Sequence, residues 1–369
     1  MQYKDFKDGI RLSRLGMGNM RLPETQDANG THIDFEKAQA LIDQAYAAGV
    51  NYFDTAYIYH GGMSEVFTGR SLKKYPRASY YVADKYNLEA NSDYEAEFAE
   101  QLDRLQLDTV DFYMLHGVND HSADRFMTNG CIDYFNKQKA AGRIHYFGFS
   151  FHGGPETLRR MLTANQWDFV QIQLNYYDWF FGVAKELYEI LTAANIPVMV
   201  MEPVHGGMLA NLNEAGSTIL VAADPTRTQA SWAMRWVKSL GGVQVVLSGM
   251  SEPAQMTENL ATFSAEETLD EAGWEVVRKA AEAHRASVAV LCTSCRYCTP
   301  NCPMGLDIPR LLHAYNDAKI GGSWRLSSLS GLPDDKKPSA CIGCGACMGH
   351  CPQTLHIPEY MAEMAEMMK

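Results

Sequence analysis

The side chains with the most distinctive chemistry are the cysteines near the end of this 369-residue chain. Eight of the nine cysteines lie between Cys292 and Cys351, in two runs with the same spacing, Cys-x2-Cys-x2-Cys-x3-Cys-Pro. The first run begins at Cys292 and the second at Cys341. Thiolates at this spacing can hold successive corners of one [4Fe–4S] cube, which takes four cysteine ligands. The pattern therefore predicts two iron–sulfur clusters, whose chemistry is the transfer of single electrons.

The fourth cysteine of each run has a different predicted role from the first three. The repeated spacing resembles that of bacterial ferredoxins with two clusters, in which the fourth cysteine ligates the cluster of the other run. On this pattern, the predicted ligand sets are Cys292, Cys295, Cys298 and Cys351 for one cluster, and Cys341, Cys344, Cys347 and Cys302 for the other. A zinc ribbon is the alternative, but zinc sites usually pair two Cys-x2-Cys elements and do not repeat the longer unit.

A second group of reactive side chains lies at the ends of three predicted strands, far from the cysteines in sequence. The group comprises Asp54, Tyr59, Lys85 and His116. Such groups, brought together, are suited to protonate a carbonyl oxygen while a hydride attacks its carbon. We expect Tyr59 to be the acid and Lys85 to stabilise its phenolate with a nearby positive charge. Asp54 would hold Lys85 in place, and His116 would hydrogen-bond the substrate oxygen. Taken singly, each residue also has a purely structural interpretation.

The elements that must position these residues alternate between strand and helix. The segments with strand character are 12–20, 51–56, 79–86, 109–116, 144–151, 168–176, 196–203 and 243–249. The segments with helical spacing of apolar residues are 34–48, 64–75, 92–106, 124–141, 154–165, 183–194, 226–240 and 253–263. This alternation implies parallel strands, and eight units match a (β/α)8 TIM barrel, whose active sites form at the carboxyl ends of its strands. A doubly wound sheet is the alternative, but Gly16-Met17-Gly18 lacks the third glycine of its phosphate-binding fingerprint.

The expected fold class is therefore α/β, with a barrel followed by a small, mainly α-helical, ferredoxin-like iron–sulfur domain. We expect the barrel at residues 1–265, a connector helix at 266–287 and the cysteine domain at 288–369. Helical patterns at 307–318 and 356–368 make the last domain resemble α-helical ferredoxin domains more than the compact βαββαβ ferredoxin.

The barrel also resembles a known enzyme family. The segments FDTAYIYHGGMSE, VADKY and DFYMLH, which contain Asp54, Tyr59, Lys85 and His116, resemble the aldo/keto reductase family, whose tetrad is Asp, Tyr, Lys and His on a (β/α)8 barrel. The resemblance implies catalytic roles for these four residues, NADP(H) as cofactor with NAD as the alternative, and a small carbonyl substrate. The cofactor-binding residues that it implies are Ser150, Gln171, Gly249, Ser251, Gln255, Glu258 and Asn259. Together with the cysteine domain, it indicates the subgroup that carries a C-terminal ferredoxin domain.

Three residues depart from the family pattern. Phe151 stands where many relatives have Asn, Met201 stands where a ring-stacking aromatic residue is expected, and Gln255 replaces an Arg that binds the 2′-phosphate in many members. An aromatic run at 176–181 follows the sixth strand. It could line a pocket for an apolar carbonyl or pack against the barrel, and the sequence does not separate these two interpretations.

Composition excludes several other classes of protein. The net charge of −12 disfavours a nucleic acid or an anionic membrane as partner. No run of 18 apolar residues predicts a membrane span, and the N-terminal residues lack the apolar core of a signal peptide. Because a secreted disulfide scaffold would be short and would spread its cysteines, we expect a cytoplasmic protein.

The two groups of residues imply chemistries that differ in electron number. A nicotinamide passes a hydride, whereas a [4Fe–4S] cluster passes one electron, so coupling them requires a flavin-like carrier or a redox partner protein. The first hypothesis is an oxidoreductase whose barrel reduces a carbonyl while the clusters transfer electrons. The alternative is a ferredoxin-like electron-transfer protein whose barrel is a docking or nucleotide-sensing module. In a third hypothesis the clusters are only structural.

Overall fold

Eight parallel strands close into a barrel in the computed structural model, which describes residues 1–27, 30–286 and 288–368. Around the barrel the strands follow the order β10-β11-β12-β3-β6-β7-β8-β9. Their bounds are β3 Leu15–Gly18, β6 Tyr52–Asp54, β7 Tyr81–Tyr86, β8 Val110–Val118, β9 Ile144–Phe151, β10 Phe169–Gln173, β11 Val198–Met201 and β12 Val243–Ser248. The predicted (β/α)8 barrel is confirmed, and the doubly wound alternative is wrong because the sheet closes on itself.

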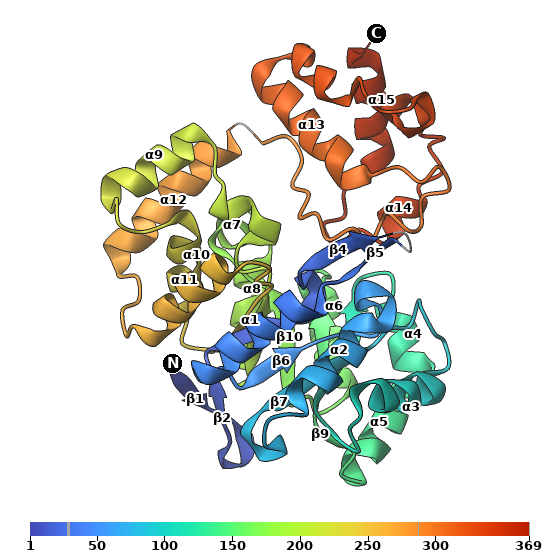
Figure 1. Ribbon diagram of the computed structural model, residues 1–369, viewed down its shortest axis with the longest axis vertical. Helices are drawn as coiled ribbons and strands as arrows, with labels where there is room; N and C mark the ends of the chain where they lie inside the picture. The colour runs from blue at the N-terminus through green and yellow to red at the C-terminus, as the bar shows by residue number, and fades with distance from the viewer. Residues whose placement is uncertain (28–29, 287, 369) are drawn as a thin grey trace. The chain divides into compact units, whose positions relative to one another are not determined.

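Helices follow the strands and cover the outside of the barrel (Figure 1). Their bounds are α1 Phe35–Ala47, α2 Met63–Leu72, α3 Tyr94–Leu105, α4 Ala123–Thr128, α5 Cys131–Ala140, α6 Pro155–Ala164, α7 Tyr176–Phe181, α8 Ala184–Ala193, α10 Gln229–Lys238 and α11 Pro253–Ser264. The single helix predicted over 124–141 is wrong. Gly130, with φ of 88°, separates α4 from α5 in a left-handed conformation that glycine adopts without a steric penalty.

The alternation of side chains along the strands determines which residues face the barrel interior. The inward-facing core is filled by apolar side chains from all around the barrel: Leu12, Tyr52, Ala83, Phe112, Met114, Tyr146, Phe169, Met199, Val245 and Leu247. Because successive strand residues point to opposite faces, the residue two positions further along each strand also points inward. That step leads from Tyr52 to Asp54 and from Ala83 to Lys85. The polar side chains therefore lie directly above the apolar core, at the carboxyl ends of the strands.

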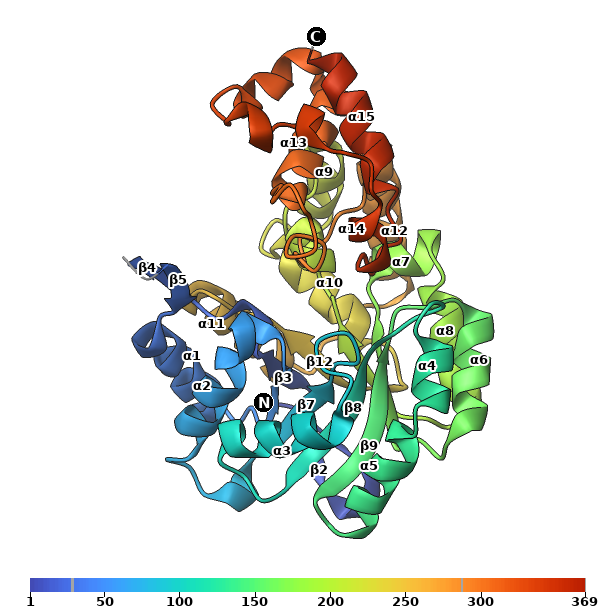
Figure 2. The same cartoon turned by 90° about the vertical axis from the view of Figure 1, so that its right-hand side faces the viewer.

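Two antiparallel hairpins accompany the barrel. One pairs β1 (Tyr3–Asp5) with β2 (Arg11–Ser13), and the other pairs β4 (Glu24–Asp27) with β5 (Gly30–Ile33). Neither hairpin was predicted, and the residues of the second are mostly exposed and polar and give no apolar alternation. Figure 2 shows β7, β8 and β9 side by side in the barrel wall, as their pairing requires.

The chain divides into two compact units, Met1–Pro203 with Ala233–Asp270, and Val204–Trp232 with Glu271–Lys369. In the second unit, helix α9 (Glu214–Ala223) lies beside α12 (Glu271–Arg285), which corresponds to the predicted connector helix (Figure 1). The described residues of the cysteine segment contribute three further α-helices: α13 Ile308–Gly321, α14 Ala346–Gly349 and α15 Ile357–Met367.

An apolar core joins the helices of the cysteine segment. Leu311 and Leu312 of α13 are buried in it together with Met361 and Met364 of α15. The predicted helical character of this region is confirmed. Among the described residues, no helix is both long enough and apolar enough to cross a membrane.

We expect Gly69→Ala to destabilise the barrel, although alanine favours helices. A Cβ atom at Gly69 in α2 would lie 2.3 Å from the carbonyl oxygen of Leu105, so the backbones of α2 and α3 would have to separate. Such overpacking typically costs about 1–3 kcal/mol, whereas helix propensity alone would add roughly 1 kcal/mol of stability. Urea denaturation measures the difference. Gly241→Ala, where a Cβ meets nothing within 4 Å, is the control. A Gly69→Ala variant as stable as the parent would contradict the close packing of these helices.

Candidate functional site

The first unit brings together the four side chains predicted to act on a carbonyl. Asp54 ends β6, Lys85 lies in β7, His116 lies in β8, and Tyr59 begins the short helix η3 (Tyr59–Gly62) after β6. All four are buried, and the most exposed of them, Tyr59 and His116, are 8% exposed. They occupy the end of the barrel where the active sites of this architecture form.

Lys85 is the centre of this group. Its Nζ donates a hydrogen bond to Asp54 Oδ1 at 2.7 Å and another to the carbonyl oxygen of Thr55. The same Nζ lies 4.8 Å from the centroid of the Tyr59 ring. Burial raises the pKa of Asp54, and the positive charge of Lys85 opposes that rise. The pair therefore holds an ammonium charge in a dry position against the phenol ring.

The backbone around Tyr59 is held in an unusual conformation. His60 and Gly61 follow with φ values of 50° and 63°, and Gly62 has φ of 90°. A left-handed conformation costs little at glycine but is uncommon at His60, so other contacts must maintain it. One such contact joins His60 Nδ1 to Glu24 Oε1 of the β4–β5 hairpin at 3.1 Å. The unpredicted hairpin thus supports the loop that carries the phenol.

His116 is placed by an irregularity in β8. The register between β8 and β9 shifts between Leu115 and Val118, and Gly117 has φ of 69°. Such bulges redirect side chains at the rims of barrels. The Tyr59 and His116 rings meet edge to face, with centroids 5.8 Å apart. Burial first, and then the charge of Lys85, lower the pKa of His116 well below 6.5, so its imidazole is neutral at neutral pH.

Of the two residues predicted to bind the nicotinamide, Ser150 already has a hydrogen-bond partner within the protein, whereas one atom of Gln171 has none. The hydroxyl of Ser150 accepts a hydrogen bond from the Gly117 N–H at 2.8 Å, so it supports the bulge at His116. Gln171 is buried, and its Nε2 lies 3.7 Å from Met201 Sδ. Its Oε1 has no hydrogen-bond partner among the described residues. A buried acceptor of this kind suits the amide N–H of a carboxamide.

The residues predicted to hold the rest of the dinucleotide lie after β12 and in α11. Gln255 Oε1 accepts hydrogen bonds from the backbone N–H groups of Ser251 at 2.8 Å and Glu252 at 3.2 Å. Asn259 is buried and donates to Ser248 Oγ. The backbone N–H groups just before α11 therefore already have a hydrogen-bond acceptor, the side chain of Gln255. The remaining predicted residues are the exposed Gly249, which follows β12, and the partly buried Glu258, in the middle of α11.

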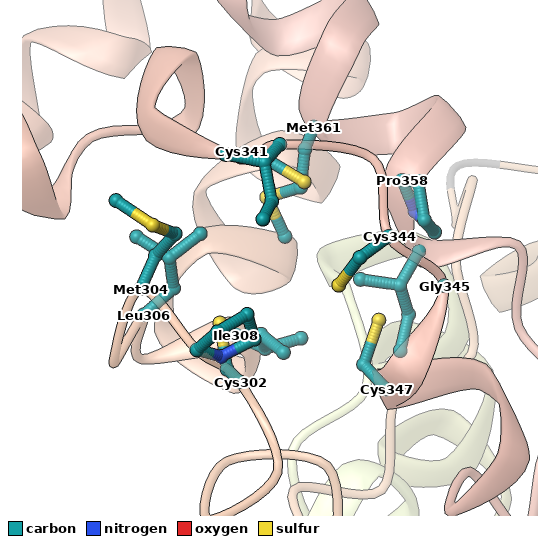
Figure 3. Close-up of a pocket in the computed structure, with 13 residues that line it drawn as sticks. Cys302, Met304, Leu306, Ile308, Cys341, Cys344, Gly345, Cys347, Pro358 and Met361 are labelled. Carbon is teal, nitrogen blue, oxygen red and sulfur yellow. The ribbon is translucent and has the colours of Figure 1, made fainter.

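The second unit gathers one predicted ligand set around an apolar hollow of about 350 Å³ (Figure 3). The cysteines that line it are Cys302, Cys341, Cys344 and Cys347. Met304, Leu306 and Met361 are among the other residues that line it. Cys302 thus lies with the second run and not with its own, as the swapped assignment requires.

The other predicted set lines a separate hollow of about 300 Å³. Its cysteines are Cys292, Cys295, Cys298 and Cys351. Burial raises the pKa of Cys298 to about 12 and that of Cys347 to about 11, a preference for the thiol that bound iron would reverse. Within the described ranges, no three His, Cys, Asp or Glu side chains converge on a position for a single metal ion. Four cysteine sulfurs around one hollow are instead the ligand set that an iron–sulfur cube takes, so the residues fit the predicted clusters.

The aromatic run after β10 packs mainly against helices. Tyr176 and Tyr177 are buried, and the rings of Tyr176 and Trp179 meet Trp236 of α10 edge to face. These contacts support the packing interpretation for the part of the run that they involve.

Sequence reasoning missed one polar residue in the barrel site. Asn87 follows β7, and its Nδ2 lies 3.3 Å from Nδ1 of His116. Its position two residues after Lys85 was the available signal, but the contact with β8 depends on the folded barrel.

The carboxyl end of this barrel carries a buried Asp–Lys pair, a phenol and an imidazole. These are the side chains that a carbonyl oxidoreductase needs. The family model "Aldo/keto reductase family" matches residues 14–282, and "4Fe-4S dicluster domain" matches residues 291–356. The chain belongs to the aldo/keto reductase family and carries a 4Fe–4S dicluster domain, which confirms the resemblance seen in the sequence.

Similar proteins agree with this assignment. NADH-specific methylglyoxal reductase from Escherichia coli (strain K12) is 26% identical over 323 residues, covering 74% of this chain and 96% of the relative. L-galactose dehydrogenase from Arabidopsis thaliana is 28% identical over 288 residues, covering 71% and 87%. The holo form of an aldo-keto reductase from Bacillus halodurans superposes with a TM-score of 0.63 at 24% identity, covering 77% of this chain and 97% of that structure. This last likeness shows the shared fold.

Paired cysteine variants test the swapped ligand sets. If Cys351 serves the cluster of the first run, Cys292→Ala with Cys351→Ala removes one cluster and leaves about half of the iron. Cys341→Ala with Cys351→Ala then removes both clusters. Iron and sulfide analysis with EPR of the reduced protein measures this, and Cys131→Ala, at a buried position at the start of α5, is the control. The opposite pattern in the two double variants would show that each run holds its own cluster.

Proposed function

We propose that the barrel reduces a small carbonyl compound, with Tyr59 as proton donor, and that the dicluster domain transfers single electrons. The observation that carries the first part is the position of Lys85 Nζ, which is bound to Asp54 at 2.7 Å and lies 4.8 Å from the Tyr59 ring centroid. A fixed positive charge beside a phenol favours the phenolate that remains after the proton has left. Because the pair is buried, solvent does not screen this effect strongly.

His116 would orient the substrate in this reaction. Its lowered pKa keeps the ring neutral, so it can donate one hydrogen bond to the carbonyl oxygen without adding a second positive charge beside Lys85. Tyr59 would then give its proton to the same oxygen. The two rings meet edge to face, which lets one substrate atom face both groups.

A bound nicotinamide would supply the hydride to the carbonyl carbon. The residues at the barrel mouth fit its carboxamide, because Gln171 offers a buried acceptor that has no partner among the described residues. Ser150 would act less directly, since its hydroxyl holds the Gly117 backbone and thereby the bulge at His116.

The start of α11 bears on the choice between NADP(H) and NAD(H). Gln255 Oε1 already occupies the N–H groups of Ser251 and Glu252, which an extra phosphate would otherwise use. Glu252 adds an exposed negative charge at the same place. NADP(H) remains the family expectation, but these contacts favour NAD(H), as in the E. coli relative described as NADH-specific.

The dicluster domain would exchange electrons with a separate carrier. Around the second cluster site, Cys344 is exposed and its neighbour Ile342 is 64% exposed. An exposed cysteine ligand would place its cluster at the surface, within reach of a one-electron partner. A flavin carrier or a redox protein would fill this role.

Replacement of Tyr59 tests the proposed reaction. Tyr59→Phe should lower kcat for carbonyl reduction by roughly 10²–10⁴-fold, the usual contribution of a positioned acid. Stability should change little, because only the hydroxyl is removed. The assay follows oxidation of NADH and NADPH with small aldehydes and ketones in cluster-reconstituted protein. Tyr57→Phe, which removes a hydroxyl bonded to Glu100 outside the site, should retain the parent rate. Equal rates for Tyr59→Phe and the parent would overturn the mechanism and favour a barrel that only docks partners or senses nucleotide.

The pH dependence tests the protonation state of His116. Because its pKa is lowered well below 6.5, the imidazole stays neutral as the pH falls through that value. We therefore expect kcat/KM to remain level between about pH 8 and pH 6.5, and to decline only at clearly lower pH, where the ring gains a proton. In His116→Gln that acid decline should be absent. An inflection near pH 6.5 in the parent that disappears in His116→Gln would contradict the buried, neutral imidazole.

A further inference from the structure

A loop that follows β7 places an amide against the imidazole of the barrel site. Asn87 Nδ2 lies 3.3 Å from His116 Nδ1. The backbone of Asn87 is itself fixed, because its N–H donates to Oε1 of the buried Glu97 in α3 at 2.6 Å. The Asn87 amide is therefore held in place by the surrounding structure.

The orientation of the Asn87 amide follows from its other contacts. Its Oδ1 accepts hydrogen bonds from the backbone N–H groups of Glu89 at 3.1 Å and Ala90 at 2.9 Å. If the amide were turned over, its NH2 group would face these two donors and neither could be satisfied. The NH2 group must therefore face His116.

This contact fixes the position of the ring proton. An amide NH2 can only donate, so Nδ1 of His116 must be the acceptor, and in a neutral imidazole the proton is then on Nε2. The lowered pKa of His116 agrees with a neutral ring.

We propose that Asn87 is a positioning residue that holds His116 as the Nε2–H tautomer, so that Nε2 donates to the substrate oxygen. This inference rests on the proposed carbonyl reduction for its functional part, whereas the tautomer itself can be measured without substrate. Asn87 acts through His116 and need not touch the substrate.

The decisive variant is Asn87→Asp, which preserves the shape of the side chain. One carboxylate oxygen can still accept from Glu89 and Ala90, but the other is now an acceptor facing Nδ1. His116 must then carry a proton on Nδ1, either as the other tautomer or as imidazolium. Asn87→Ala removes the donor without replacing it and should give a mixture of tautomers.

The experiment measures the 15N chemical shifts of the His116 ring in full-length, cluster-reconstituted protein, with His116→Gln used for assignment. The parent should show a protonated Nε2 and an unprotonated Nδ1, and Asn87→Asp should show a protonated Nδ1. With carbonyl substrates, Asn87→Asp should lower kcat on the order of 100-fold, and Asn87→Ala should lower it less. The control is Asn91→Asp, a change in the same loop at a side chain that accepts from the Asp93 N–H.

Two results would overturn the proposal. One is a protonated Nδ1 in the parent, and the other is an unchanged tautomer in Asn87→Asp. If the tautomer changes as expected but neither the parent nor any variant reduces carbonyls, the proposed function fails while the role of Asn87 in fixing the ring stands. If Tyr59→Phe abolishes turnover and Asn87→Asp changes neither tautomer nor kcat, the proposed function stands and this inference fails.

Discussion

The buried pair of Lys85 and Asp54 is the interaction on which the rest of the barrel site depends. Removing two charges from water costs several kcal/mol for each ion, so such a pair persists only with close contacts. Here Lys85 Nζ donates to Asp54 Oδ1 at 2.7 Å and to the Thr55 carbonyl, whereas the buried Asp54 Oδ2 has no hydrogen-bond partner among the described residues. Loss of either partner would leave an unpaired buried charge, at a typical cost of about 3–5 kcal/mol. The same charge faces the Tyr59 ring, and it adds to the effect of burial, which is the main cause of the lowered pKa of His116.

The barrel supplies the positions that this pair needs. Inward-facing residues form an apolar core and then, one step further along the strands, a polar layer. The alternation of side chains along the strands does not by itself explain the positions of His116 and Tyr59. A bulge braced by Ser150 places His116, and a left-handed turn supported by the contact between His60 and Glu24 carries Tyr59. The site thus combines regular strands with two local irregularities, and a separate side-chain contact stabilises each of them.

Much of this arrangement could be predicted from the sequence, because it depends on local patterns. Buried parallel strands give apolar runs, and the cysteine spacing indicates which sulfurs belong to one cluster. Because Asp54, Lys85 and His116 lie at the ends of predicted strands, the sequence indicated that they meet at one end of the barrel. What the sequence could not show depends on tertiary contacts. The β4–β5 hairpin has no apolar pattern, and the bonds from Asn87 to His116 and from Ser251 to Gln255 exist only in the folded chain.

We propose that the chain joins a site for two-electron chemistry to a domain for one-electron chemistry. Tyr59 needs no cluster to give a proton to a carbonyl oxygen while the carbonyl carbon takes a hydride from a nicotinamide, and we propose that carbonyl reduction takes place in the barrel alone. The most direct test uses NADH and NADPH deuterated at the carbon that carries the hydride, with product analysis by mass spectrometry. Direct reduction predicts deuterium on the former carbonyl carbon. Product that forms at the same rate but carries only solvent hydrogen at that carbon would show that the electrons travel through the clusters, and would contradict the account.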